Sequence, residues 1–215
     1  MRLYHYLSTC YAVDDLERRR LKIAQVEDLN DPFELLAPRL DTDEQHQIWE
    51  GWKEAQKNRW GALCFSKTWR NPVMWGHYAD RHRGMCLGFD IPDKLLMPIL
   101  YKQERPKIDV EKLHQDAKLT GDVANRFLRT KYAGWSYERE VRVYARLNNR
   151  DRESGLFFAD FGPDLKLAEV IAGPLCELEL GGIQKSVQPA DSSVTIKRAR
   201  LAARRFQIVD DHSGK

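Results

Sequence analysis

The chain of 215 residues lacks any apolar run that approaches the roughly 20 residues needed by a membrane-spanning helix. Residues 1–6 also lack the extended apolar region of a signal peptide, so we expect a cytoplasmic location. The net charge of +3 is too small to indicate a nucleic-acid partner by itself. The hydrophobic content of 42% and the charged content of 31% are typical of a folded globular protein.

Cysteine is scarce and scattered, with no paired spacing that would indicate zinc or a disulfide framework: Cys10, Cys64, Cys86 and Cys176. In a reducing compartment these are expected to be ordinary buried or half-buried thiols. His77, His82 and Cys86 are spaced across an expected helix and strand and do not have zinc-ligand spacing, so no metal site is predicted. A Gly-rich phosphate loop is also missing, because Gly84-x-x-x-Gly88 does not have that pattern.

No internal repeat or Gly/Ser-rich linker divides the chain, which indicates one α+β domain over residues 1–209 and a flexible tail at 210–215. Strands are expected at 2–6, 21–24, 60–65, 85–90, 137–145, 156–161, 165–171, 194–201 and 205–209. Helices are expected after a cap at Thr9 or Asp14, after Pro32, over 41–58, from Pro72, over much of 109–131 and within 176–187. Residues 95–101 fit either a strand or a helix.

Residues 65–90 concentrate aromatic and polar side chains that a simple core segment does not need. Pro72 suits the first turn of a helix, because its missing N–H would be unpaired there. Trp75 and Tyr78 then fall on one helical stripe, with His77 at its flank. The pattern predicts a strand that ends at Ser66, an aromatic helix and a second strand, with polar groups where these elements meet.

A second informative stretch covers residues 135–144. On a strand, Glu138, Glu140, Arg142 and Tyr144 share one face, because side chains alternate. The two carboxylates repel unless Arg142 lies between the charges or one carboxylate has a raised pKa. A solvated face would explain this pattern, whereas the flanking aromatic residues indicate a face that borders a cleft.

Five motifs occur in order between Leu3 and about Gly173: Leu-Tyr-His-Tyr, Asn-Asp-Pro-Phe-Glu, Phe-Ser followed by Met-Trp-Gly-His-Tyr-Ala, Gly-Met-Cys-Leu-Gly-Phe and Trp-Ser-Tyr-Glu-Arg-Glu-Val-Arg. In this order the chain resembles the bacterial domain-of-unknown-function family 2971, a name that supplies no activity. A further resemblance does supply one. The series of a strand with His, a strand ending in Ser and a late strand with Glu-x-Glu is similar to the ADP-ribosyltransferase fold, including its nucleic-acid-modifying toxin branch.

The second resemblance implies a mixed, mostly antiparallel split β-sheet flanked by helices. It also implies an NAD-dependent ADP-ribosyltransferase of the toxin or phage-defence kind. In that reading His5 would hydrogen-bond a ribose of NAD, and Ser66 would hold the later glutamate. Glu140 would be the catalytic carboxylate, and Glu138 would activate a macromolecular acceptor.

The same resemblance implies contacts to the cofactor. Tyr78 or Trp75 would stack on the nicotinamide ring, and Tyr6 and His77 are further candidate contacts. Arg142 or Arg2 would meet the pyrophosphate. These enzymes carry either an Arg-Ser-Glu or a His-Tyr-Glu triad, and this chain mixes the two. The choice between Ser66 and Tyr78 therefore stays open.

Other functions fit the same residues. A non-catalytic module could use the aromatic cleft to bind a nucleotide or a partner chain. Nuclease chemistry by His77 with Glu138 or Glu140 ranks lowest, because no metal-ligand cluster accompanies it. The basic segment 197–205 fits a solvated edge strand, and for a transferase it would instead contact a protein or nucleic-acid acceptor.

Overall fold

The computed structural model describes residues 1–25, 28–33, 38–57, 59–107, 110, 126, 128–188 and 191–212. The strands are β1 (Arg2–Leu7), β2 (Arg20–Lys22), β3 (Ala24–Gln25), β4 (Trp60–Ser66), β5 (Met85–Asp90), β6 (Met97–Pro98), β7 (Leu100–Lys102), β8 (Thr130–Tyr132), β9 (Glu140–Arg146), β10 (Phe158–Asp160), β11 (Lys166–Ala172), β12 (Thr195–Leu201) and β13 (Ile208–Asp210). The α-helices are α1 (Thr9–Arg18), α2 (Asp43–Lys57), α3 (Pro72–Tyr78) and α5 (Leu180–Ser186), and the 3₁₀ helices are η2 (Asp93–Leu95) and η4 (Ala133–Glu138).

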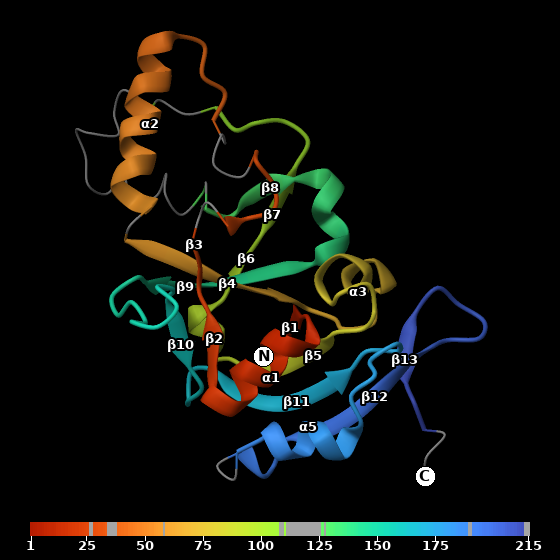
Figure 1. Ribbon diagram of the computed structural model, residues 1–215. Helices are drawn as coiled ribbons and strands as arrows, with labels where there is room; N and C mark the ends of the chain where they lie inside the picture. The colour runs from red at the N-terminus through yellow and green to blue at the C-terminus, as the bar shows by residue number, and fades with distance from the viewer. Residues whose placement is uncertain are drawn as a thin grey trace.

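Among the described residues, one sheet of nine strands organises the fold (Figure 1). Its order is β13-β12-β11-β5-β1-β4-β9-β6, and β3 pairs with β4. Strands β11 and β12 pair in parallel, and the other neighbours in this sheet are antiparallel. The predicted single α+β domain with a mixed, mostly antiparallel sheet is confirmed. No helix within the described part of the chain is long and apolar enough to cross a membrane.

The main sheet is paired most weakly between β1 and β4. Strand β1 pairs with β5 along its whole length, from Arg2–Asp90 to Leu7–Met85, but with β4 only at Tyr4–Ser66. Strand β4 pairs in turn with β9 from Trp60–Arg146 to Ser66–Glu140. Apart from this one position, β1 and β4 are not paired with each other, and we call the space between them the opening between β1 and β4.

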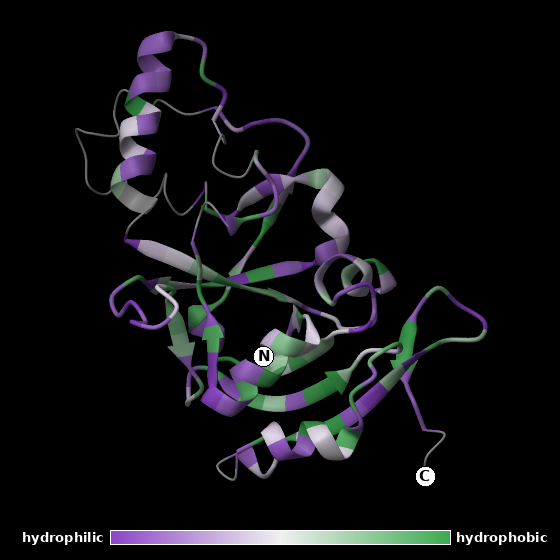
Figure 2. Ribbon diagram, viewed as in Figure 1, coloured by the Kyte–Doolittle hydropathy of each residue, from purple (hydrophilic) through white to green (hydrophobic). Residues whose placement is uncertain are grey.

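Two hydrophobic clusters cover the two faces of the sheet. Met85, Leu87 and Phe89 of β5 pack with residues of α1 and α5, whereas Cys86 packs with Trp75 of α3. The strand predicted at 85–90 is thus confirmed. Cys86 and Gly88 on its second face are buried as well, whereas Asp90 at its end is partly exposed. Figure 2 shows that the strands of the sheet carry hydrophobic residues, whereas α2 is mostly hydrophilic.

The helix that begins at Pro72 forms as the sequence predicts. Pro72 takes the first helical position, and the Asn71 side chain caps the helix by accepting a hydrogen bond from the Val73 N–H at 3.0 Å. Helix α2 lies within the predicted range 41–58. Strand β4 ends at Ser66, as expected. These local signals place Ser66 and α3 next to the opening between β1 and β4.

Several predicted boundaries were wrong. Helix α1 starts after Ser8, whose side chain makes no capping bond, so neither Thr9 nor Asp14 is the cap. The strand expected at 137–145 begins only at Glu140, because η4 occupies Ala133–Glu138 and Arg139 turns the chain with a positive φ of 49°. Glu138 therefore does not lie on the strand.

Other predictions concern short or partly described segments. Residues 21–24 split between β2 and β3, and residues 95–101 contribute to η2, β6 and β7. The strand predicted at 205–209 forms at Ile208–Asp210, so Asp210 lies in β13 and not in the expected tail. Residues 213–215, Glu34 and most of the helix predicted over 109–131 lie outside the described residues.

Replacing Trp75 by alanine is expected to lower the free energy of unfolding by ~3–5 kcal/mol, because the change leaves a cavity under α3. Trp75 is fully buried, and its ring meets that of Tyr6 edge-on at 5.3 Å. Val73→Ala on the same helix is the control, since Val73 is 44% exposed and its change should stay within ~0.5 kcal/mol. Chemical denaturation measures both, and equal effects would contradict this packing.

Candidate functional site

A cavity of about 110 Å³ lies where β1 and β4 separate. Residues from both strands, from α3 and from the stretch around η4 and β9 line it, among them His5, Ser66, Tyr78, Glu138, Glu140 and Arg142. These residues lie far apart in the sequence. The fold therefore brings together all four predicted catalytic residues, because β1 and β9 flank β4 on either side.

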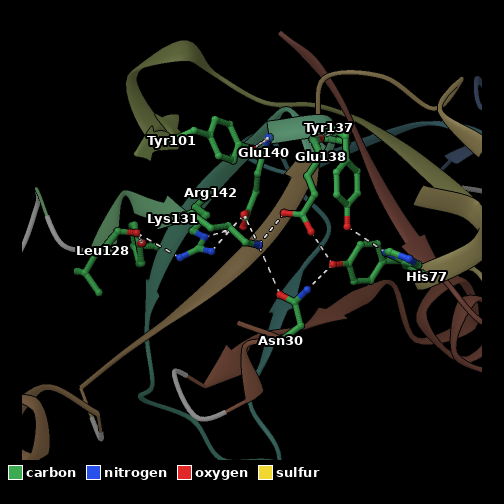
Figure 3. A network of polar contacts seen from close by, with 12 residues as sticks. Asn30, His77, Tyr101, Leu128, Lys131, Tyr137, Glu138, Glu140 and Arg142 are labelled. Atoms are coloured by element: carbon green, nitrogen blue, oxygen red, sulfur yellow. Dashed lines mark hydrogen bonds and ion pairs between the residues drawn. The ribbon is translucent and has the colours of Figure 1, made fainter. Parts of the chain in front are cut away.

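The ammonium group of Lys131 lies at the centre of the polar side chains in this cavity (Figure 3). Its Nζ donates to Glu138 Oε2 at 2.6 Å and to Glu140 Oε2 at 3.1 Å. All three side chains are at least 94% buried, since their exposed fractions are 2%, 4% and 6%. One cation thus joins both carboxylates of the Glu-x-Glu motif and prevents the repulsion that the sequence alone implies.

Arg142 makes a second ion pair with Glu140. Its Nε donates to Oε1 at 2.6 Å and its Nη2 to Oε2 at 3.1 Å, a bidentate geometry. The Arg142 Nη1 donates to the Leu128 carbonyl at 3.2 Å, and the backbone N–H of Glu140 donates to the Tyr101 hydroxyl at 2.7 Å. Arg142 is therefore a structural partner of Glu140, and the sequence-based pyrophosphate role would require it to leave this ion pair.

Glu138 is held from the opposite side by Tyr78. The Tyr78 hydroxyl donates to Glu138 Oε1 at 2.5 Å, and the Asn30 side-chain amide donates to the same hydroxyl. Lys131 Nζ also donates to Asn30 Oδ1 at 3.4 Å, which closes a ring of polar contacts (Figure 3). Tyr78 thus serves as a hydrogen-bonding residue at the wall of the cavity.

The two carboxylates differ in acidity. Burial raises the pKa of Glu140, but the ion pairs with Arg142 and Lys131 outweigh burial and lower the pKa to about 2. For Glu138, burial raises the pKa, and the favourable contacts with Lys131 and Tyr78 do not fully offset it. Glu140 is therefore a carboxylate at neutral pH, and Glu138 is the more basic of the pair.

His5 presents a neutral imidazole to the cavity. Burial lowers the pKa of His5, and the hydrogen bond to the Cys64 carbonyl opposes this shift only in part. The bond joins Nδ1 to the carbonyl oxygen at 2.7 Å. Because a carbonyl only accepts, Nδ1 carries the proton and Nε2 is left as an acceptor.

Ser66 acts on the backbone and not on a carboxylate. Its Oγ donates to the Glu138 carbonyl at 2.6 Å and accepts from the Thr68 N–H at 3.3 Å. These bonds differ from the predicted contact with the catalytic glutamate, because the hydroxyl reaches the main chain of Glu138 where η4 ends. Ser66 positions Glu138 by fixing the turn that carries it.

The other predicted contacts divide between cavity and core. Tyr6 lines the cavity, and its hydroxyl donates to the Thr68 carbonyl at 2.9 Å. Trp75 does not line it, because the ring is fully buried and Nε1 donates to the Trp69 carbonyl at 2.6 Å. His77 lies outside the lining and contacts the Tyr137 hydroxyl at 3.1 Å. Arg2 pairs with Asp90 and Glu169 at a distant part of β1.

Sequence reasoning missed Lys131, Asn30 and Tyr101. Lys131 fell in a stretch interpreted as helix, and only its position shortly before the Glu-x-Glu motif could have drawn attention to it. In the structure β8 carries it, and its ammonium also lies 5.2 Å from the Trp135 ring. Asn30 belongs to the Asn-Asp-Pro-Phe-Glu motif, from which no contact with the carboxylates is predicted, and no local signal links Tyr101 to Glu140.

Cysteines and metal ligands add no second centre to this site. None of the four cysteines forms a disulfide, and Cys86 and Cys176 are buried. Within the described ranges, no three His, Cys, Asp or Glu side chains are grouped so that they could hold a metal ion.

Part of the chain matches a known family. Residues 74–143, about a third of the chain, match the family described as "Protein of unknown function (DUF2971)". This range runs from α3 to β9 and includes Tyr78, Lys131, Glu138 and Glu140, whereas His5 and Ser66 precede it. No curated protein and no solved structure matches the chain. The matched segment is thus similar to a family whose name carries no activity.

The acidity of Glu140 predicts how stability depends on pH. Its pKa is lowered by folding from an ordinary value of 4.5, so its contribution is complete above about pH 4.5 and is lost as the pH falls toward 2. At pH 7 Glu140→Gln should cost ~3–5 kcal/mol of unfolding free energy, because it leaves Arg142 without its buried counter-charge. The difference in unfolding free energy between the native chain and Glu140→Gln should be smaller at pH 3 than at pH 7.

Glu153→Gln is the control for this comparison. The Glu153 side chain is 76% exposed and pairs with Arg18, so its loss should cost less than ~1 kcal/mol at either pH. Urea unfolding at pH 7 and pH 3 measures all three chains. If the difference in unfolding free energy between the native chain and Glu140→Gln were the same or larger at pH 3, Glu140 would not be an ion-paired carboxylate.

Proposed function

We propose that the chain is an NAD-dependent ADP-ribosyltransferase, which breaks the bond between nicotinamide and ribose and transfers ADP-ribose to a macromolecule. The observation that carries the proposal is the meeting of His5, Ser66 and Glu140 at one cavity, in the opening between β1 and β4. A split sheet with these residue types at its opening is what the resemblance to ADP-ribosyltransferases implies. An effector of the toxin or phage-defence kind would act in this way.

The charges of the two carboxylates suit the reaction. As the C1′–N bond breaks, nicotinamide leaves with the electron pair and the ribose becomes oxocarbenium-like. Glu140 is ionised at neutral pH, so it can stabilise this positive charge. The acceptor then forms a bond to C1′ and loses a proton, for which Glu138, with its raised pKa, is the better base.

His5 and the size of the cavity constrain how NAD would bind. The unprotonated Nε2 can accept a hydrogen bond from a ribose hydroxyl. A cavity of about 110 Å³ is smaller than the ~300–1,000 Å³ typical of ligand pockets. It would hold the nicotinamide end, with the remainder of the dinucleotide on the surface outside.

A second candidate is a non-catalytic nucleotide- or partner-binding module, and one observation favours it. Each carboxylate oxygen of Glu138 and Glu140 already accepts a hydrogen bond from Tyr78, Lys131 or Arg142. A ribose hydroxyl would have to share or displace one of these donors. A module that binds NAD without turnover would need no such rearrangement.

Incubation with NAD labelled in the adenine ring and a bacterial lysate tests the transferase. The native chain should release nicotinamide and move label onto macromolecules. Glu140→Gln should slow nicotinamide release by about 10²–10³-fold, the range typical of a lost electrostatic group. His5→Asn should weaken NAD binding while it leaves the ion pairs of Lys131 intact, so it serves as a second variant if Glu140→Gln fails to fold.

Glu169→Gln provides the matched control. Glu169 is also an ion-paired, mostly buried glutamate, but it pairs with Arg2 and Lys197 and does not line the cavity. The variant should keep full activity. Binding of NAD by the native chain without release of nicotinamide would support the module. A folded native chain that neither binds nor cleaves NAD would rule out the transferase and any module that binds NAD.

A further inference from the structure

A larger depression adjoins the cavity at β7 and β8. Two hollows of about 560 and 290 Å³ share the side chains of Lys102, Glu104, Arg105, Pro106 and Thr130. We call the combined depression the β7–β8 groove; its other lining residues are Phe33, Arg39, Leu100, Gln103, Lys107, Arg126, Lys131 and Tyr132. In Figure 1 strands β7 and β8 lie between the nine-stranded sheet and α2.

The charge of the β7–β8 groove is strongly one-sided. Its exposed cations are Arg39, Lys102, Arg105, Lys107 and Arg126, and its one acidic lining residue among the described part of the chain is Glu104. Of these cations, Arg39 pairs with Asp41 at 3.0 Å. The net charge of the whole chain is only +3, so this groove is a local concentration of positive charge.

Two exposed aromatic rings accompany these cations. Phe33 is 55% exposed and Tyr132 is 51% exposed, and both line the groove. The Arg105 guanidinium lies 5.2 Å from the Phe33 ring. Cations that follow a groove, together with aromatic faces on which bases can stack, are the features that bind single-stranded nucleic acid without sequence preference.

The groove leads to the candidate active site. Lys131 lines both the groove and the smaller cavity, while its neighbours in β8, Thr130 and Tyr132, line the groove. Within the groove, the Arg39 N–H donates to the Pro106 carbonyl at 3.1 Å and Arg39 forms a bridge with Lys107, so two lining segments are held together. A strand lying in the groove would therefore lie next to Lys131, the buried residue that contacts both carboxylates.

We propose that the β7–β8 groove binds single-stranded nucleic acid and brings it to the active site as the acceptor. Binding to the groove stands on its own charge and shape, whereas the role as acceptor rests on the proposed transferase function. The chemistry recognised is a phosphate backbone with unpaired bases. A duplex would hide its bases from Phe33 and Tyr132, so it should bind more weakly.

The basic segment predicted at 197–205 is less suited to this role. Lys197 pairs with Glu169 and Asp210, and Arg198 donates to the carbonyls of Cys176 and Leu178. The arginines beyond them, Arg200, Arg204 and Arg205, line a separate hollow of about 480 Å³ at the β12–β13 hairpin. That hollow shares no lining residue with the cavity that holds Glu140.

Fluorescence anisotropy with a labelled 12-nucleotide oligo-dT tests the binding surface. The native chain should bind it with a slope of log K against log salt of about −3, if four of the cations meet phosphates. The double variant K102E/R105E should weaken binding at least about tenfold. R204E/R205E makes the same change of charge at the hairpin and should leave binding within about twofold.

The aromatic residues separate nucleic acid from a general polyanion. The double variant F33A/Y132A should weaken oligo-dT binding about tenfold or more and leave heparin binding unchanged. The proposal would be overturned if R204E/R205E lost oligo-dT binding while K102E/R105E kept it. It would also be overturned if F33A/Y132A changed the affinities for oligo-dT and heparin by the same factor. All of the substituted residues are exposed, so the variants should fold, and thermal unfolding checks this for each one.

Transfer of label to oligo-dT and release of nicotinamide are measured separately, so the acceptor site and NAD cleavage are tested independently. With the native chain, label from NAD should move to oligo-dT, and K102E/R105E should abolish this transfer while nicotinamide release into water stays unchanged. Oligo-dT binding to the groove without any nicotinamide release would retain the binding surface and overturn the transferase. Nicotinamide release with label transferred equally by K102E/R105E would retain the transferase and overturn the groove as the acceptor site.

Discussion

The contact on which the site depends is the buried ammonium of Lys131 between Glu138 and Glu140. Together with Arg142 it balances two negative charges with two positive ones inside the protein. Burial of an unbalanced charge is costly, and removal of one partner from such a cluster typically costs ~3–5 kcal/mol. The cluster therefore fixes β8 and η4 to β9, and it also holds Asn30 through Lys131.

The opening between β1 and β4 provides the space in which the cavity and its charged side chains lie. Because β1 and β4 pair only at Tyr4–Ser66, space remains beside β4 for side chains of both neighbouring strands. The His5 imidazole spans this opening by its bond to Cys64, and the Ser66 hydroxyl bonds to the turn that carries Glu138. Charged groups in the middle of a sheet are thus each held by a hydrogen bond or an ion pair, as buried polar groups require.

Local signals in the sequence predict the elements of this site well. Proline at position 72 marks the start of α3, and alternation in residues 140–145 places Glu140 and Arg142 on the same face of β9. The polar neighbours Ser66 and Tyr78 follow from the same patterns. These predictions succeed because each depends on residues that are close in the sequence.

Contacts between distant segments could not be predicted in the same way. Lys131 approaches Glu140 only because β8 lies beside η4, and the left-handed conformation of Arg139 shifts Glu138 off the strand while it keeps the carboxylate in the cavity. The sequence around Trp75 does not show whether its ring stacks on a ligand or packs in the core. In the structure the ring is fully buried and contacts Tyr6 and Trp69, so it is a core residue. The β7–β8 groove likewise collects cations from separate segments, and the total charge of the chain conceals it.

The most direct test of the account is a crystal structure of the chain with a non-cleavable NAD analogue. We expect the ribose on the nicotinamide side to lie in the opening between β1 and β4, with its hydroxyls in contact with His5 Nε2 and Glu140. An analogue bound at another surface, with the ion pairs of Lys131 undisturbed and the cavity empty at saturating concentration, would contradict it.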